Sequence, residues 1–375
     1  MFLYNKVRQM MRKYPPLMNL VKRAIPKKYL VRITKSLYKP KKEIRNGQML
    51  LIVCNDGFNQ NFPSAASLMR VGFARGWAQK IGPAKLVSIY DLVREIGLYD
   101  KPAVFISAYE FNNLTLNDCK KLSNTDLFVW IGVHPKKIKK FSSLVLKNSF
   151  AYDRPFLLSA YSKIITAEPK FLWNSTGEKT MYWYEDWIKD GFKWETMHPA
   201  VDPERYYPDL NKKKFGHIKM AYVGGYWPEK AQAFDLYFRK WEKIFVPYGY
   251  ETWPYKNYGG QLTEKEERQL YSSSQLIPLV TTPAGWLIGE ITERYLKAPA
   301  CKAFCIADEN STLREIFKEN EMIQAKNSEH FHQLINDFLK NKIDKENWIK
   351  KAYLAVKERH LYSHRAIQIK NALKK

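Results

Sequence analysis

Two ionisable side chains follow apolar runs that are typical of buried strands. Asp56 comes after the run MLLIVCN, beside Gly57, and His134 comes after TDLFVWIGV and directly before a proline. An imidazole or a carboxylate at the end of a strand can face a cleft and take a proton from a substrate hydroxyl. The plainer interpretation, a loop side chain that is merely exposed, stays open for both. Asp56 and His134 are therefore the candidate catalytic residues.

Two other stretches could hold a phosphate. Gly224 and Gly225 follow the apolar run IKMAYV, and without side chains their backbone can approach a phosphate or an opposing domain closely. Thr282 and Gly285 lie in a loop before the helical pattern EITERYLKA, and the free N–H groups of a helix start favour an anion. A tight turn between strand and helix would explain the two glycines equally well.

The elements that must position these residues alternate between strand and helix. Apolar runs of strand length recur with helical segments between them on both sides of a proline- and lysine-rich linker at residues 199–215. This pattern predicts an α/β protein with two doubly wound, Rossmann-like domains that face a cleft, where the carboxyl ends of both sheets bind ligands. The expected units are residues 1–48, a basic amphipathic segment; 49–208, a first Rossmann-like domain; 209–345, a second Rossmann-like domain; and 346–375, a terminal helix.

The charge is concentrated at the start of the chain. The net charge is +25, and residues 1–48 contain fourteen Lys or Arg but a single acid, Glu43. Apolar residues recur there every three or four positions, which suits a helix lying on an anionic membrane surface. Packing of this segment on its own domain is the alternative. Charges interrupt it too often for a signal peptide.

Cysteines and metal motifs offer little. The four cysteines, Cys54, Cys119, Cys301 and Cys305, form no CxxC pair and have no histidine at zinc-ligand spacing, which favours reduced thiols in a cytoplasmic protein. No apolar run reaches the length of a membrane-spanning helix. No HExxH or DxD motif is present, so we expect a site that needs no metal.

Several phrases of the second half, taken in order, resemble a known family. AYVGGYWPEKAQAF resembles the glycine-turn segment of GT-B glycosyltransferases, and HPAVDPERYYP resembles their interdomain phrase. ITERYLKAPACKAFCIADENSTLREIF is similar to the R-x-[FY]-E-A-[LM]-A-C-G segment of the CgeB/YkvP-like branch, and KERHLYSHRAIQI to its closing helix, which crosses back to the first domain. The resemblance covers residues 198 to the end.

The resemblance implies that residues 49–208 are the acceptor domain and that residues 209–345 are the donor domain. Lys230 and Arg294 match basic positions that in this family face the diphosphate, while Glu290 and Glu293 would bind sugar or ribose hydroxyls. An ordinary exposed pair between Glu293 and Lys297, four residues apart, is the alternative.

Three positions depart from the family pattern. Gly289 stands at the first acid of the family's E-x7-E pair, Lys297 at the second, and Lys302 at the glycine of A-C-G. The usual acid that binds the ribose is thus missing or supplied by Glu293. These departures leave both the identity of the donor and the level of activity open.

The resemblance implies a metal-independent glycosyltransferase that moves a sugar from a nucleotide-diphosphate donor, UDP- or GDP-linked, to a hydroxyl of a glycan, lipid-linked or surface-polymer acceptor. We expect it in the cytoplasm, peripheral on the inner face of the membrane through residues 1–48. An enzyme that glycosylates nucleic acid, and a non-catalytic protein of the same fold that binds membrane or nucleic acid, are the alternatives. Nucleic acid is the less favoured partner, because no recognised nucleic-acid module is present.

Overall fold

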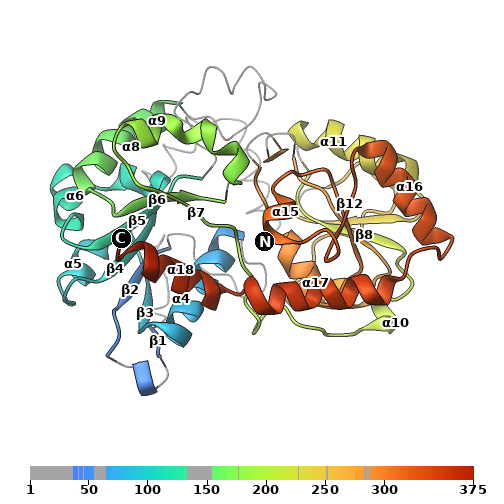
Figure 1. The fold of residues 1–375 in the computed structure, drawn as a ribbon, viewed down its shortest axis with the longest axis horizontal. Helices are drawn as coiled ribbons and strands as arrows, with labels where there is room; N and C mark the ends of the chain where they lie inside the picture. Colours follow the sequence, from blue (N-terminus) through green and yellow to red (C-terminus); the bar gives the residue numbers. More distant parts are fainter. Residues whose placement is uncertain are drawn as a thin grey trace.

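A computed structural model describes residues 37–40, 42–44, 46–54, 65–132, 154–175, 177–226, 228–250, 252–282, 285–286 and 289–375. The chain forms two lobes, each with a sheet between helices (Figure 1). We call the described residues 37–200 with 362–375 the N-terminal lobe, and 202–360 the C-terminal lobe. Most of the basic segment 1–48 lies outside the described residues.

The N-terminal lobe contains a seven-stranded sheet in the order β1-β3-β2-β4-β5-β6-β7, parallel except for the edge strand β1. Apolar runs such as LLIV and AVFIS are buried on both faces, as a parallel sheet covered by helices requires. Its strands are β1 (Leu37–Tyr38), β2 (Leu50–Val53), β3 (Ala84–Val87), β4 (Ala103–Ser107), β5 (Asp126–Trp130), β6 (Phe171–Asn174) and β7 (Trp194–Thr196).

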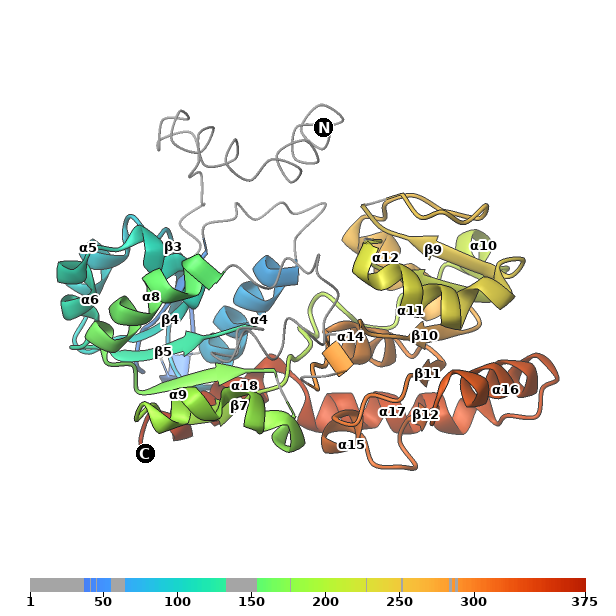
Figure 2. The same ribbon diagram turned by 90° about the horizontal axis from the view of Figure 1, so that it is seen from above.

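Helices cover the two faces of this sheet (Figure 2). They are η1 (Lys42–Ile44), α4 (Ala65–Lys80), α5 (Leu92–Ile96), η2 (Ala108–Asn113), α6 (Leu116–Leu122), α8 (Arg154–Ala167), η3 (Glu178–Tyr184) and α9 (Glu185–Lys189). The aromatic-rich stretch around residue 185 forms η3 and α9, and β7 follows as the last strand of the sheet, which the sequence pattern did not predict.

The C-terminal lobe is a second parallel α/β unit. Strands β10, β11 and β12 pair in that order, β8 pairs with β9, and the Ala221 N–H donates to Leu276 O (3.1 Å), joining the two sets. The strands are β8 (Met220–Val223), β9 (Phe245–Tyr248), β10 (Ile277–Leu279), β11 (Cys305–Ala307) and β12 (Ile323–Gln324). Strand β9 ends at Tyr248, before the aromatic run YETWPY.

The helices of this lobe are α10 (Lys212–Phe215), α11 (Pro228–Phe238), η4 (Arg239–Trp241), α12 (Glu264–Ser273), α14 (Arg294–Ala300), α15 (Leu313–Ile316), α16 (Ser328–Leu339) and α17 (Lys345–Arg359). Cys301 and Cys305 are free thiols buried in the core of this lobe, where they pack rather than bind a ligand. Cys54 and Cys119 are likewise buried.

The chain crosses twice between the lobes, and the two crossings lie side by side. The Val201 N–H donates to His360 O (2.9 Å), and the Tyr362 N–H donates back to Val201 O (3.2 Å). Beyond this point α18 (Tyr362–Ala372) leaves the C-terminal lobe and packs on α4 (Figure 1). The buried Arg365 secures the crossing, because its Nε donates to His198 O (2.8 Å).

A second contact joins the lobes through Glu315 of α15. Its Oε2 accepts the Glu178 N–H (3.0 Å) of the N-terminal lobe and lies 3.4 Å from His198 Nε2. The LREIF phrase therefore does more than form a helix, because it holds the start of η3 against the C-terminal lobe.

Candidate functional site

The glycine turn after β8 is too tight for a side chain. The Gly224 N–H donates to Tyr248 O (2.8 Å), and Trp253 Nε1 donates to Gly224 O (2.9 Å), so both backbone groups of the glycine are engaged. A Cβ atom on Gly224 would lie 2.8 Å from Nη2 of Arg294. The turn, which continues into Gly225, therefore packs closely against the guanidinium of Arg294.

Arg294 joins the carboxyl ends of two strands. Its Nε donates to Val223 O (2.7 Å) at the end of β8 and its Nη1 donates to Val280 O (3.4 Å) after β10. The guanidinium carbon lies 4.1 Å from the centre of the Tyr222 ring. Arg294 therefore supports the floor of the site through two of its nitrogens, and Nη2 is the one nearest the turn.

The loop after β10 folds on itself. We call its described residues, Thr281, Thr282, Gly285 and Trp286, the β10 loop. The Gly285 N–H donates to Thr282 Oγ1 (3.1 Å), and the Trp286 N–H donates to Thr282 O (3.0 Å). A Cβ on Gly285 would lie 2.6 Å from Thr281 Oγ1, so a larger residue would displace the threonine.

The helix expected directly after this loop begins later. Gly285 and Trp286 form part of a helical turn, but α14 starts at Arg294 and has seven residues. Glu290 and Glu293 therefore precede α14 rather than lie on it, and the expectation that its N-terminus directly follows the loop is wrong. What the two strand ends offer is a loop and a glycine turn supported by an arginine.

Asp308 is a site residue that the sequence reasoning missed. It follows β11 directly and its side chain is fully buried (0% exposed). Its Oδ2 accepts the Thr281 N–H (2.7 Å) and Trp286 Nε1–H (2.7 Å), and its Oδ1 accepts the Tyr295 hydroxyl (2.5 Å). Burial raises the pKa of Asp308 to about 6, although the hydrogen bonds it accepts oppose the shift. The available signal was an acid directly after a buried strand, beside the loop of its neighbour.

Gly289 lies at a contact between the lobes. Its φ is +64° and its carbonyl accepts the Gly177 N–H (3.2 Å) of the N-terminal lobe. A Cβ there would lie 2.2 Å from Thr312 Oγ1 and 2.8 Å from Thr180 Oγ1. Position 289 is a contact between the lobes that admits only glycine. The neighbouring Glu290 is held through its backbone, because its N–H donates to Gly285 O (2.8 Å).

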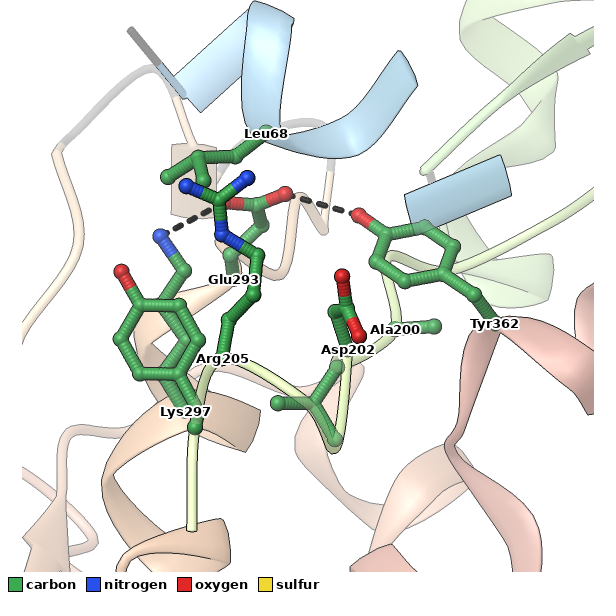
Figure 3. Close-up of a pocket in the computed structure, with 9 residues that line it drawn as sticks. Leu68, Ala200, Asp202, Arg205, Glu293, Lys297 and Tyr362 are labelled. Carbon is green, nitrogen blue, oxygen red and sulfur yellow. Dashed lines mark hydrogen bonds and ion pairs between the residues drawn. The ribbon is translucent and has the colours of Figure 1, made fainter. Parts of the chain in front are cut away.

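Glu293 and Lys297 form a pair between the lobes (Figure 3). Lys297 Nζ lies 2.8 Å from Glu293 Oε2, and the Tyr362 hydroxyl donates to Glu293 Oε1 (2.8 Å). Lys297 is only 8% exposed, so the interpretation as an exposed surface pair is wrong. Burial alone would lower the pKa of Lys297, but the carboxylates of Glu293 and Glu267 together outweigh it and raise that pKa, so the ammonium persists.

The cavity beside this pair is small. It measures about 10 Å³, which is room for one water molecule, and its walls come from α4, from the interlobe linker and from α14 (Figure 3). Asp202 and Arg205 of the linker line it with the Glu293–Lys297 pair. In this arrangement both carboxylate oxygens of Glu293 are engaged by Tyr362 and Lys297, and the pair serves the contact between the lobes.

Lys302 has a backbone conformation that favours glycine. It follows α14 with φ +59°, a left-handed conformation that glycine adopts without cost. Its Nζ lies 5.1 Å from the centre of the Tyr353 ring. The departure at 302 is thus a strained helix end, remote from the loop and the turn.

Comparison with known proteins now places this architecture. Residues 210–371 match the model of a family described as glycosyl transferase-like. Among solved structures, sucrose-phosphate synthase from Thermosynechococcus elongatus aligns with a TM-score of 0.59 and 8% identity, covering 87% of this chain and 98% of that one. The chain has the GT-B glycosyltransferase fold.

Two other GT-B structures were determined with ligands. Anabaena HepE in complex with UDP and glucose has a TM-score of 0.58 and 10% identity, and covers 87% of this chain and 99% of its own. An α-glucosyltransferase in complex with UDP-glucose and DNA containing an abasic site has a TM-score of 0.59 and 10% identity, with coverage of 88% and 100%. No curated protein is significantly similar to this chain in sequence.

The remaining expected residues take different places in the GT-B fold. Lys230 lies on α11, which begins at Pro228 just after the glycine turn. His134 and Asp56 fall outside the described residues, so their catalytic roles stay predictions. The structure therefore brings together the glycine turn, Arg294 and the β10 loop at one edge of the second sheet, and moves Glu293 to the contact between lobes.

A buried cluster supports the corresponding edge of the first sheet. Arg70 Nε donates to Val53 O (2.6 Å) at the end of β2, and its Nη2 lies 3.3 Å from Glu110 Oε1. Glu110 Oε2 also accepts the Ser107 N–H (2.8 Å) at the end of β4. This cluster fixes the ends of β2 and β4, and sequence patterning gave no sign of it because both charges are far apart in the chain.

The described part of the chain contains neither a metal-ligand cluster nor a membrane-spanning helix. No group of three or more His, Cys, Asp or Glu side chains there could hold a metal ion. None of the described helices is long and apolar enough to cross a membrane.

Proposed function

We propose that this protein is a glycosyltransferase that transfers a sugar from a nucleotide-diphosphate sugar to an acceptor hydroxyl. One observation carries the proposal: the match to the glycosyl transferase-like family falls on residues 210–371, the part of the chain that contains the glycine turn, Arg294 and the β10 loop. The UDP and UDP-glucose complexes of Anabaena HepE agree with a nucleotide-sugar donor.

The chemistry follows from what the strand ends present. The departing diphosphate needs positive charge and N–H donors placed before the reaction begins. We assign this task to Arg294 Nη2, to Lys230 and to the backbone of the glycine turn and β10 loop, without a metal ion. Because Glu293 is engaged between the lobes, we assign contacts with the sugar or ribose hydroxyls to Glu290.

The acceptor side is assigned to the N-terminal lobe. His134 or Asp56 would act as the base that takes the proton from the acceptor hydroxyl. We further propose that the enzyme belongs to the CgeB/YkvP-like branch and acts on a glycan or lipid-linked acceptor at the cytoplasmic face of a membrane. Residues 1–48 would hold it there, and vesicle co-sedimentation with and without anionic lipid, before and after deletion of residues 1–40, tests that part.

The first experiment is a thermal shift series with UDP, GDP, CDP and dTDP, followed by a hydrolysis screen with the corresponding nucleotide sugars. We expect at least one nucleoside diphosphate to raise the melting temperature, and the matching sugar nucleotide to be hydrolysed slowly in the absence of an acceptor. If none of the four stabilises the protein and none of the sugars is released, the protein is a non-catalytic relative and the proposal is wrong.

A second candidate, glycosylation of nucleic acid, rests on the net charge of +25 and on the α-glucosyltransferase of similar fold whose structure contains DNA. DNA co-sedimentation at two salt concentrations separates it from the first. Binding that falls steeply with salt and that survives deletion of residues 1–40 would favour the nucleic-acid acceptor.

A further inference from the structure

We propose that Asp308 is a positioning residue of the donor site, whose carboxylate holds the β10 loop in the shape that receives the nucleotide sugar. The proposal rests on the proposed function and adds to it a residue outside the family phrases. Asp308 would touch neither the sugar nor the diphosphate. It would act through the loop residues that do.

The geometry joins the loop at both of its ends. The Thr281 N–H at the start of the β10 loop and Trp286 Nε1–H at its end donate to the same oxygen of Asp308, each at 2.7 Å. The loop between these two points is closed by the Thr282 contacts with Gly285 and Trp286. One carboxylate oxygen therefore sets the separation between the first and last described residues of the loop.

The other carboxylate oxygen connects the loop to α14. The Tyr295 hydroxyl donates to it, and Tyr295 directly follows Arg294, the residue that supports the glycine turn. The two halves of the expected donor site, loop and turn, thus meet through Asp308 and its neighbour on α14. A disturbance at Asp308 should reach both.

This arrangement buries the Asp308 carboxylate without a cationic partner among the described residues. No Lys or Arg among the described residues forms an ion pair with Asp308. It accepts hydrogen bonds from the Thr281 and Trp286 N–H groups and from the Tyr295 hydroxyl, and Tyr222 of β8 and Tyr237 of α11 are further titratable groups near it. An ionised carboxylate in such a place is costly unless hydrogen bonds compensate it. An acid kept at this cost, at an edge where ligands bind, indicates that its three hydrogen bonds to the β10 loop and to α14 are needed.

The hold extends to the contact between the lobes. The Gly289 N–H donates to Trp286 O (3.2 Å), and Gly289 O accepts the Gly177 N–H. By holding the β10 loop, Asp308 therefore also positions Gly289 for its hydrogen bond with the N-terminal lobe. The shape of the proposed donor site is in this way linked to the contact between the lobes.

The test compares Asp308→Ala with Asp308→Asn in the full chain. An asparagine oxygen can accept both loop donors while its amide donates to the Tyr295 oxygen, whereas alanine leaves all three groups without a partner. We expect Asp308→Ala to weaken binding of UDP, or of whichever of UDP, GDP, CDP and dTDP stabilises the wild type most, by at least about tenfold. Asp308→Asn should recover most of that loss, and the KM for the nucleotide sugar should rise more than kcat falls.

Cys305→Ala is the matched control, because it opens a cavity in β11 three residues earlier without touching the loop. It should lower stability and leave nucleotide affinity unchanged. Hydrogen exchange of the peptide covering residues 280–286 gives a second measure that needs no ligand: exchange should accelerate in Asp308→Ala only.

The outcomes separate the two claims. If the wild type binds no nucleotide, the proposed function fails and the role of Asp308 fails with it, whatever the exchange rates show. If the wild type binds and Asp308→Ala binds as well as Cys305→Ala does, or if the loop peptide exchanges at the wild-type rate, the positioning role is wrong while the proposed function stands.

Discussion

Gly76 offers a sharp test of how the terminal helix α18 joins the lobes. It lies inside α4, and a Cβ there would be 2.4 Å from the backbone carbon and oxygen of Tyr362 and 2.8 Å from Ser363 N. These neighbours are backbone atoms at the start of α18, so no rotation of a side chain can relieve the clash. Gly76→Ala must therefore push α18 away from α4.

The magnitude follows from two opposing effects. Alanine is favoured over glycine inside a helix by about 1 kcal/mol, which would stabilise α4 on its own. Overpacking of a close contact costs about 1–3 kcal/mol, and here it also displaces the Tyr362 hydroxyl from Glu293 Oε1 (2.8 Å), a hydrogen bond to a charged group worth about 1.5–3 kcal/mol. We expect a net loss of about 2–4 kcal/mol in the free energy of unfolding.

Gly97→Ala is the control for the same chemical change. Gly97 ends α5 with φ −66°, and the nearest atom to a Cβ there is Arg94 O at 3.5 Å, an ordinary contact. Alanine should be neutral or stabilising by up to about 1 kcal/mol. Urea unfolding of both variants, followed by circular dichroism and tryptophan fluorescence, measures the difference. Equal stability of the two variants would refute the close packing of α18 on α4.

Four further predictions concern the C-terminal lobe. The folded pKa of Asp308 is about 6 and its ordinary value is 3.8, so ionisation of this carboxyl costs the folded state about 3 kcal/mol above pH 6, and the cost disappears as the pH falls toward 4. In urea titrations, the wild type should therefore gain stability relative to Asp308→Asn between pH 7 and pH 4.5. A constant stability difference between the two proteins would contradict this expectation. Gly289→Ala should lower the free energy of unfolding by about 2–4 kcal/mol, because of the positive φ and the clash with Thr312. Gly289→Glu should not raise the affinity for the nucleotide. Tighter nucleotide binding of this variant in calorimetry would overturn the interpretation of position 289 as an interlobe contact. Lys302→Gly should raise the free energy of unfolding by about 0.5 kcal/mol, and the melting temperature with it, because glycine relieves the strained backbone. A lower melting temperature would show that the Tyr353 contact contributes more than the backbone strain costs. Arg294→Ala should weaken nucleoside diphosphate binding about tenfold or more, and unchanged binding in a folded variant would contradict its assignment to the donor site.

Much of the fold could be predicted because the spacing of apolar residues and the positions of turn residues indicate the same elements along most of the chain. The strands before Asp56 and His134 and the glycine turn after β8 follow from apolar runs bounded by turn residues, whereas the single terminal helix expected over residues 346–375 is two helices, α17 and α18. The misses occur where tertiary contacts decide. Strand β7 is a half-buried edge strand within an aromatic stretch, and its pairing with β6 is not encoded in local pattern.

The site could be predicted less fully, because its groups are defined by partners distant in sequence. Lys297 resembles a surface lysine until Tyr206 and Tyr362 enclose it, and Glu293 changes from an expected donor ligand to an interlobe contact for the same reason. Asp308 is a single acid in a turn, and only the pairing of β10 with β11 places it beneath the Thr281 amide.

The central claim is that a nucleoside diphosphate binds across the carboxyl ends of β8 and β10. Hydrogen exchange of the wild-type protein with and without UDP and GDP tests it most directly. We predict slower exchange, with at least one of the two nucleotides, in the peptides that cover residues 223–226 and 280–290. Binding without protection of either peptide, or protection confined to the N-terminal lobe, would contradict the claim.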